Sequence, residues 1–245
     1  MRLLRSSLTL LTALFLAGAD ARAQLNPGQT GMNAAMTKLF GEFTAFSSKA
    51  DLKMLDSADK ESIGLVMDFT LLDGKMRADI DMATLKNKEF PPEVYAQFKQ
   101  MGMDRMTTVV RPDKKTTLLI YPALQSYAEL PMSKESQAEL AGDYKVEKIK
   151  IGNETAGGHP CEKYKVTVRG SKGEKHDAFV WNATDFQKFP VQIQMNEPNA
   201  KILIVYKDIK LARPDAKQFD VPPGFTKYDS VERLMQGAMA KTLGK

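Results

Sequence analysis

The sequence predicts a mainly β protein of the α+β class, in which helices cover an antiparallel sheet. Apolar residues alternate with polar ones over several segments, which is the pattern of strands with one buried face. Turn signals recur at intervals of about 8 to 12 residues in the C-terminal half, which is typical of a barrel or sandwich and not of βαβ units. Apolar stripes at helical spacing occur near both ends of the chain.

The clearest hairpin spans residues 61–82. Apolar residues alternate along residues 63–71, and Asp73-Gly74 then forms a hairpin turn signal. In the second strand the charged residues 75, 77, 79 and 81 face away from the core, whereas Met76, Ala78, Ile80 and Met82 face it. This alternation predicts an antiparallel strand pair with one solvated side, and residues 52–55 are expected to pair with it.

Further strands are expected at residues 106–111, 116–121, 126–130, 144–151, 161–169, 175–181, 190–195 and 201–211. Residues 202–205 are apolar on both faces of their strand. That strand should therefore be covered on both sides, which a helix packed inside a curved sheet would achieve.

Four helices are expected. The first carries an apolar stripe that continues as far as Phe46, and the second follows Pro91-Pro92, where proline suits a helix start. Ser133 is expected to cap a third helix over residues 133–140, and Ser230 a C-terminal amphipathic helix. The stripe of the first helix consists of Met32, Met36, Leu39, Phe40, Phe43 and Phe46.

Residues 1–23 have the features of a cleavable secretory signal. Arg2 and Arg5 precede an uncharged stretch over residues 6–19, and Ala21-Arg22-Ala23 is the small-x-small pattern that signal peptidase accepts. The apolar run is well short of the roughly 20 residues of a membrane-spanning helix. We therefore expect cleavage after Ala23, a periplasmic or secreted location and no stable membrane insertion. No linker or repeat divides residues 24–245, which predicts a single domain.

Composition argues against several function classes. The chain of 245 residues has a net charge of +5, and its 35 Lys and Arg are interleaved with 30 Asp and Glu, unlike the clustered charge of nucleic-acid binders. One Cys and two His leave little room for a metal site, and no phosphate-binding glycine motif occurs, so no cofactor or metal is expected. His159 near Cys161 is the most site-like pair, but Pro160 lies between them. A packed cysteine beside a turn is the favoured interpretation, and a hydrolase the disfavoured one.

Methionine is the feature that points to function. Thirteen Met follow residue 23, and several lie where the sheet is expected to meet its helices. Flexible thioether side chains suit either a cavity for a varied apolar ligand or a loosely specified core, and both interpretations stay open. The residues predicted to bind a ligand are Met67, Phe69, Met76, Ile80, Met82, Phe98, Met101, Leu118 and Ile120.

Several segments together resemble a family of exported bacterial proteins, domain of unknown function 4412, which is distantly similar to the periplasmic lipoprotein carriers LolA and LolB. The likeness spans roughly residues 31–228. It rests on the strand pair around Asp73-Gly74, residues 116–121 with 127–132, Gly157-Gly158-x-x-Cys161-x-Lys163-Tyr164-x-Val166, Val180-Trp181 with residues 190–195, and Phe219-Asp220-Val221-Pro222-Pro223-Gly224-Phe225.

The resemblance implies an incomplete antiparallel β-barrel whose concave side is closed by helices around an apolar cavity, which holds acyl chains in the carriers. The helix after Ser230 departs from the carriers. Arg77 and Arg111 are both possible by position as counterparts of the carriers' cavity arginine, although the alternation places Arg77 on the outer face.

The expected function is therefore non-catalytic binding of a lipid, acyl chain or other hydrophobic ligand. The alternative is a protein-interaction or envelope-sensing domain, in which the same groove binds a polypeptide segment of an envelope protein.

Overall fold

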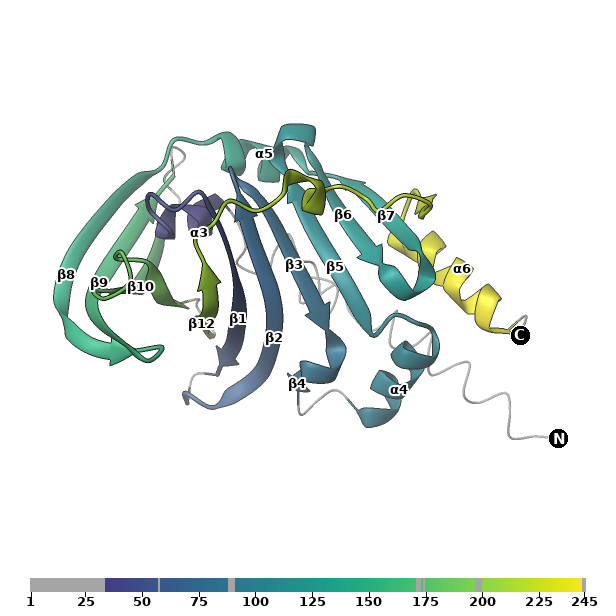
Figure 1. Cartoon of the computed structure of the whole chain (residues 1–245), viewed down its shortest axis with the longest axis horizontal. Coiled ribbons are helices and arrows are strands. Elements are labelled where there is room, and N and C mark those ends of the chain that lie inside the picture. The colour runs from purple at the N-terminus through teal and green to yellow at the C-terminus, as the bar shows by residue number, and fades with distance from the viewer. Residues whose placement is uncertain are drawn as a thin grey trace.

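The computed structural model describes residues 34–56, 58–87, 91–170, 173, 175–196 and 200–243. The predicted signal and its cleavage after Ala23 lie outside these residues. The described strands form one sheet, in which the neighbours run β13-β7-β6-β5-β3-β2-β1-β12-β11-β10-β9-β8, with β4 paired to β2. The sheet does not close on itself, because β13 and β8 stand at its two ends (Figure 1). The predicted fold class, an incomplete antiparallel barrel with few helices, is confirmed.

One half of the sheet is a meander in which successive hairpins pack side by side. Its β2–β3 turn is the predicted one, with Asp73 and Gly74 at φ of 49° and 82°. The β5–β6 and β6–β7 turns are each a single turn of 3-10 helix whose first residue is a proline. They are η2 (Pro112–Lys114) and η3 (Pro122–Leu124). The strands are β1 (Ala45–Leu55), β2 (Glu61–Leu72), β3 (Lys75–Asp81), β4 (Lys86–Asn87), β5 (Arg105–Arg111), β6 (Thr116–Tyr121) and β7 (Ser126–Pro131).

The other half is a second meander that returns to the start of the chain, since β12 pairs with β1 along most of its length. Its strands are β8 (Lys145–Ala156), β9 (His159–Arg169), β10 (Lys175–Ala183), β11 (Pro190–Asn196) and β12 (Lys201–Lys210). The expected strands of this half are all present, and β8 is longer than predicted. A short parallel strand that was not predicted, β13 (Thr226–Tyr228), pairs with β7.

The first helix is much shorter than the apolar stripe predicts. Helix α3 (Ala34–Leu39) stops before Gly41, whose φ of 62° breaks the helix, and Phe46 lies in β1 instead. The expected helix through Phe46 is therefore wrong in its C-terminal part, because the residues after Gly41 pair with β2. The other helices follow the prediction closely, as α4 (Pro92–Gln100), α5 (Lys134–Ala141) and α6 (Val231–Leu243). No helix of the described residues is long and apolar enough to cross a bilayer.

The position of α3 identifies the concave face of the sheet. Phe40, directly after α3, lies 6.1 Å from Phe69 of β2 between ring centroids, and α3 also contacts β9. Because β1, β12, β11 and β10 separate β2 from β9, one short helix reaches both strands only if the sheet curves around it. The largest hydrophobic cluster fills this hollow.

A strap formed by residues 211–225 crosses the opposite, outer face of the sheet and contains the 3-10 turn η4 (Ala216–Phe219) (Figure 1). Phe219 is buried there against Leu72, Val109, Leu118 and Ile120. The sheet around β3, β5 and β6 is therefore covered on its outer face by irregular chain.

Candidate functional site

A row of directly paired residues runs across the concave face through six neighbouring strands. Each member lies opposite the next, so their side chains share one face and follow one another at about 4.8 Å. From β1 to β7 the row consists of Ser48, Phe69, Ala78, Thr108, Leu119 and Ala128, all of them buried.

Parallel rows flank it on the same face. Met67 of β2 lies opposite Ile80 of β3, and Leu71 lies opposite Met76. The concave face is thus apolar over β2 and β3, as the alternation predicted, and Ile80 is only half-buried.

An aromatic cluster fills the end of this face near β1 and β12. The ring of Phe40 lies 4.9 Å from that of Phe46 and 5.5 Å from that of Tyr206, and Phe189 stacks edge-on against Phe46 at 4.9 Å. Such pairs add stability beyond the area that they bury. This end is a packed core.

Helix α6 covers the other end. Leu234 and Ala238 on its inner side are buried in one cluster with Tyr121 of β6 and Ala128 of β7. The stretch of β3, β5 and β6 between α3 and α6 presents Ala78, Thr108 and Leu119. Here a small side chain, Ala78, and a polar one, Thr108, lie next to each other among larger apolar ones.

Three buried hydroxyl groups on the concave face have no hydrogen-bond partner among the described residues: those of Ser48, Thr108 and Tyr206. The register places all three side chains on the same face, since Ser48 pairs with Phe69, Thr108 with Ala78 and Tyr206 with Ala50. A buried hydroxyl without a partner is uncommon, and either a bound water or a polar group of a ligand can supply the missing partner. Thr108 is set apart from the other two, because it lies beyond the aromatic cluster.

Four of the nine predicted ligand-binding residues lie together on the concave face: Met67, Phe69, Met76 and Ile80. The prediction also placed Phe98 and Met101 over this face. Phe98 of α4 and Met101, which follows the helix, pack with Met103 in the cluster that contains α6 and Met106, the residue opposite Ile80. Met82 is half-buried in the 3-10 turn η1 (Met82–Thr84), at the end of β3.

Leu118 and Ile120 lie on the outer face, so the structure does not bring them to the other predicted residues. Leu118 pairs with Val109 and Ile120 with Thr107, and both pack under Phe219 of the strap. Residues 118–121 are all apolar, so alternation could not tell which pair points inward. The inward residues of β6 are Leu119 and Tyr121. Thr108 was not among the predicted residues. The one feature of the sequence that places it on the concave face is its position two residues from both Met106 and Val110, because alternate residues of a strand point to the same face.

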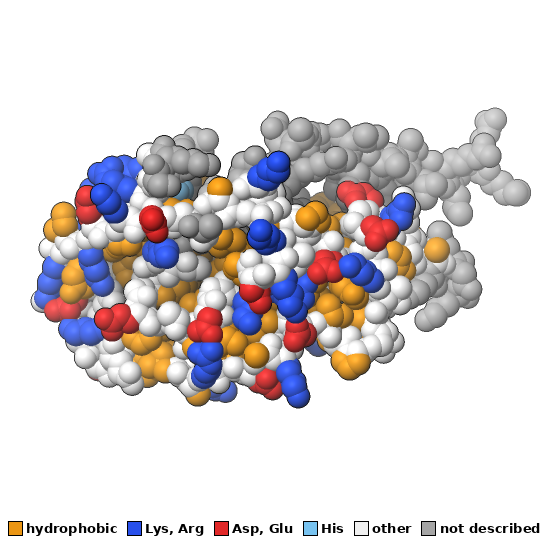
Figure 2. Space-filling model, turned by 90° about the horizontal axis from the view of Figure 1, so that it is seen from above, with side chains coloured by type: hydrophobic (Ala, Val, Ile, Leu, Met, Phe, Trp, Pro, Cys, Tyr) orange, Lys and Arg blue, Asp and Glu red, His pale blue; other side chains and the backbone are white. Residues whose placement is uncertain are grey.

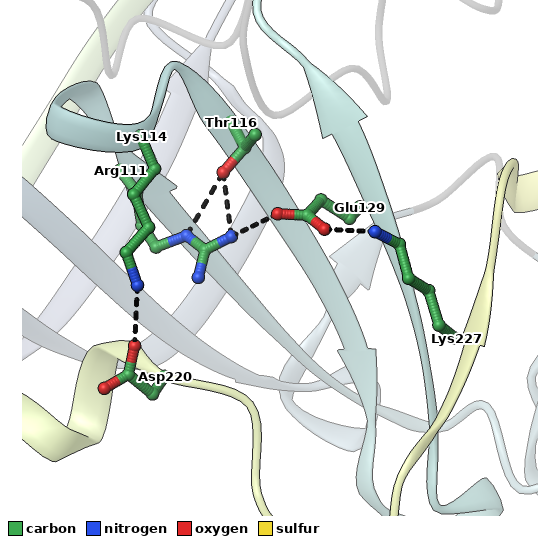
Figure 3. A network of polar contacts seen from close by, with 6 residues as sticks. All are labelled: Arg111, Lys114, Thr116, Glu129, Asp220 and Lys227. Atoms are coloured by element: carbon green, nitrogen blue, oxygen red, sulfur yellow. Dashed lines mark hydrogen bonds and ion pairs between the residues drawn. The ribbon is translucent and has the colours of Figure 1, made fainter.

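Both arginines considered above also lie on the outer face. Arg77 binds Asp79 through Nε at 2.7 Å and donates from Nη1 to the carbonyl of Gln218 at 2.6 Å. Arg111 is buried and donates to Thr116 and, at 2.6 Å, to Glu129 (Figure 3). The structure therefore places neither guanidinium on the concave face.

The same network holds the strap to the sheet. Lys227 of β13 reaches the carboxylate of Glu129 from the side opposite Arg111, and Lys114 pairs with Asp220 of the strap at 3.1 Å (Figure 3). The two cations beside it, Lys227 foremost, hold the pKa of Glu129 below its ordinary value. The outer polar network thus has a structural role.

His159 and Cys161 do not form a nucleophile–base pair. The Cys161 thiol donates to the carbonyl oxygens of His159 and Ala156, and the His159 ring bonds instead to Asp185 at 3.0 Å. Burial raises the pKa of the thiol, which disfavours the reactive thiolate. Cys161 lies beside a turn, as the favoured interpretation expected.

Two further features of the described residues bear on ligand sites. No group of three or more His, Cys, Asp or Glu side chains in that part of the chain is arranged to hold a metal ion. An open surface hollow lies beside β4, lined by Lys60, Glu61, Ser62, Leu85, Lys86 and Asn87, and none of these is a predicted site residue.

Comparison with known proteins identifies the family. The family model described as a domain of unknown function, DUF4412, matches residues 63–189, which is more than half of the chain. The chain belongs to this family. The matched segment runs from β2 to the residue before β11 and includes Ala78, Thr108 and Leu119. No curated protein matches the chain.

Solved structures with a similar arrangement include the lipoprotein LppX of Mycobacterium tuberculosis, at a TM-score of 0.39 and 13% identity over 77% of this chain and 94% of LppX. A LolA superfamily protein of Nitrosomonas europaea gives a TM-score of 0.38 and 11% identity, over 77% of this chain and 96% of that one. MucB of Pseudomonas aeruginosa, in its complex with MucA, gives a TM-score of 0.35 and 13% identity, over 77% of this chain and 61% of that one.

Proposed function

We propose that this member of the DUF4412 family is a non-catalytic, exported binding protein for a lipid, acyl chain or other hydrophobic ligand. The ligand lies on the concave face of the half-barrel, between α3 and α6, against Ala78, Thr108 and Leu119. Met67, Met76 and Ile80 form its apolar surroundings on β2 and β3.

The Thr108 hydroxyl is the observation that carries this proposal. It is 5% exposed and has no partner among the described residues, and it sits midway along a row of apolar side chains. An unpaired hydroxyl costs stability, so a ligand that supplies one hydrogen-bond acceptor there gains more than contact area. The row from β2 to β7 spans four inter-strand spacings, or about 19 Å, and this is the length of the face along which an acyl chain would lie.

Uptake of a fluorescent fatty acid by delipidated protein tests the proposal. We expect saturable binding by the wild type and at least about tenfold weaker binding by Ala78→Leu, which adds bulk beside Thr108. Ala212→Leu, at an exposed position on the strap, is the matched control and should bind as the wild type does. Ile80→Gln, at a half-buried position of the same face, is the second variant in case Ala78→Leu folds poorly.

Failure of the wild type to bind fatty acid, phospholipid or any hydrophobic probe would overturn the proposal. Native mass spectrometry of protein purified from its own envelope identifies the occupant independently. A co-purified lipid mass would support lipid binding, whereas a co-purified polypeptide held in the groove would favour the alternative of an envelope-sensing domain.

A further inference from the structure

Strand β8 is an open edge of the sheet, twelve residues long. It pairs with β9 on one side and with no other described strand. Eleven of its residues are exposed or half-buried. Edge strands of this length are normally shortened, covered or guarded, because their free N–H and C=O groups pair readily with another chain.

The exposed apolar side chains of the protein concentrate on this strand. Among the described residues, four large hydrophobic side chains are exposed, and three of them belong to β8: Val146 at 45%, Ile149 at 63% and Ile151 at 49%. The fourth is Val66 at 39%, in the interior of the sheet on β2. Apolar groups gathered along an unpaired edge mark it as a site for another chain.

Two of the three lysines of β8, Lys148 and Lys150, do not guard this edge. Lys148 lies over the Tyr164 ring, with Nζ 4.1 Å from the centroid, and donates to Asn182 at 3.3 Å. Lys150 Nζ lies 2.7 Å from the Glu162 carboxylate. Both side chains therefore lie back over neighbouring strands, which leaves the edge accessible and keeps their positive charge next to it.

This end of the sheet is basic. Strands β8, β9 and β10 together contain seven Lys and Arg against four Asp and Glu. Figure 2 shows blue side chains gathered at the left end of the molecule, where Figure 1 places these strands. A partner strand with acidic side chains would thus meet a complementary field.

We propose that β8 is a docking strand for an extended, acidic segment of a partner protein, which adds to the sheet beside it. The register sets the pattern of that segment. Lys148 and Lys150 lie on one face of β8, opposite Val166 and Tyr164, and Ile149 lies on the other, opposite Lys165. The partner segment therefore alternates acidic residues, next to the lysines, with apolar residues, next to Ile149.

In the registers centred on Lys148, Ile149 or Lys150, a second copy of this chain fits the edge less well than such a partner. Two antiparallel β8 strands related by a two-fold axis place each residue opposite itself or opposite residues symmetric about the centre. Centring the pair on Ile149 sets Lys148 against Lys150, and centring it on either lysine sets that lysine against itself. Like charges directly opposite destabilise a strand pair.

Strand β8 lies at the other end of the sheet from the proposed ligand position on β3, β5 and β6, so its test does not depend on the proposed function. The probe is a capped peptide of about nine residues with alternating Glu and Val, long enough for most of β8 at roughly 3.3 Å per residue. One control peptide carries Lys in place of Glu, and another carries N-methyl groups on alternate amides, which removes the pairing and keeps the charge.

We expect saturable binding of the Glu–Val peptide by the full chain and new hydrogen-exchange protection at alternate amides of β8. Both control peptides should fail to bind. Ile149→Glu should weaken binding about tenfold or more, whereas Val66→Glu, at the exposed apolar position outside β8, should change it less than about twofold. Circular dichroism and unfolding midpoints check that both variants fold.

Three results would overturn the proposal. Equal binding of the N-methylated peptide would show that charge alone suffices. Protection of β8 that rises with protein concentration in the absence of peptide would assign the edge to a second copy. Binding to phosphatidylglycerol vesicles that Ile149→Glu abolishes, with no peptide binding, would assign it to a membrane surface.

Discussion

Neighbouring threonines on β5 should respond oppositely to the same substitution. Thr108 points to the concave face with an unpaired hydroxyl, whereas Thr107 points to the outer face and donates to Asp79 at 2.5 Å. Both are buried, at 5% and 3% exposure. Replacement of either by valine keeps the β-branched shape and the strand preference, so the hydroxyl is the main difference.

The magnitudes follow from the hydrogen bonds. Thr108→Val removes an unsatisfied buried hydroxyl, whose cost is about 1–3 kcal/mol, and should stabilise the ligand-free protein by about 1–2 kcal/mol. Thr107→Val removes a bond to a carboxylate that Arg77 still contacts twice, and should destabilise the protein by about 1–2 kcal/mol. The two variants should therefore differ by roughly 2–4 kcal/mol in the free energy of unfolding.

Urea denaturation of delipidated protein, followed by circular dichroism, measures both values under identical conditions. Equal m-values would confirm that the two variants unfold from states of similar compactness. If Thr108→Val is neutral or destabilising, the Thr108 hydroxyl is satisfied in solution, for example by a bound water. The argument for a ligand at that position would then fail.

Three further outcomes are expected. Phe219→Ala should destabilise the protein by about 3–5 kcal/mol and expose the strap to limited proteolysis, because its ring is buried under the strap; unchanged stability would contradict that packing. Hydrogen bonds from two lysines and a tyrosine lower the pKa of Glu162 from 4.5 to about 2, so the ionised carboxylate stabilises the fold above about pH 4.5, and this contribution is lost as the pH falls toward 2. Glu162→Gln should flatten the pH dependence of stability in that window, as measured by denaturation at a series of pH values. Cys161 should react with a thiol reagent at least about a hundredfold more slowly in the native protein than after unfolding, since it is 2% exposed; a fast native reaction would show that the turn opens.

The two faces of the sheet have different physical characters. The outer face near β5 and β6 is held by ion pairs and by the strap. Arg77 bonds to Asp79 and to the carbonyl of Gln218. Arg111 and Lys227 both bond to Glu129 (Figure 3). The concave face has apolar rows and unpaired hydroxyls. A ligand is therefore expected on the concave face.

Local sequence signals located nearly every element. The Asp73-Gly74 turn and the Ser230 cap of α6 each act within a few residues, so they are visible without the rest of the fold. The one-sided alternation of β2 and β3 likewise identified Met67, Phe69, Met76 and Ile80 as a shared face. These predictions hold because their physical cause is local.

Tertiary structure decided what local pattern left ambiguous. Residues 118–121 are apolar in both phases, so only pairing with β5 and the arrival of Phe219 set Leu118 and Ile120 outward. The sequence thus determined where strands and turns form, because backbone preferences and alternation act over a few residues. Which face became concave, which strand was left as an edge and where an unpaired hydroxyl came to lie depend on contacts between residues far apart in the chain.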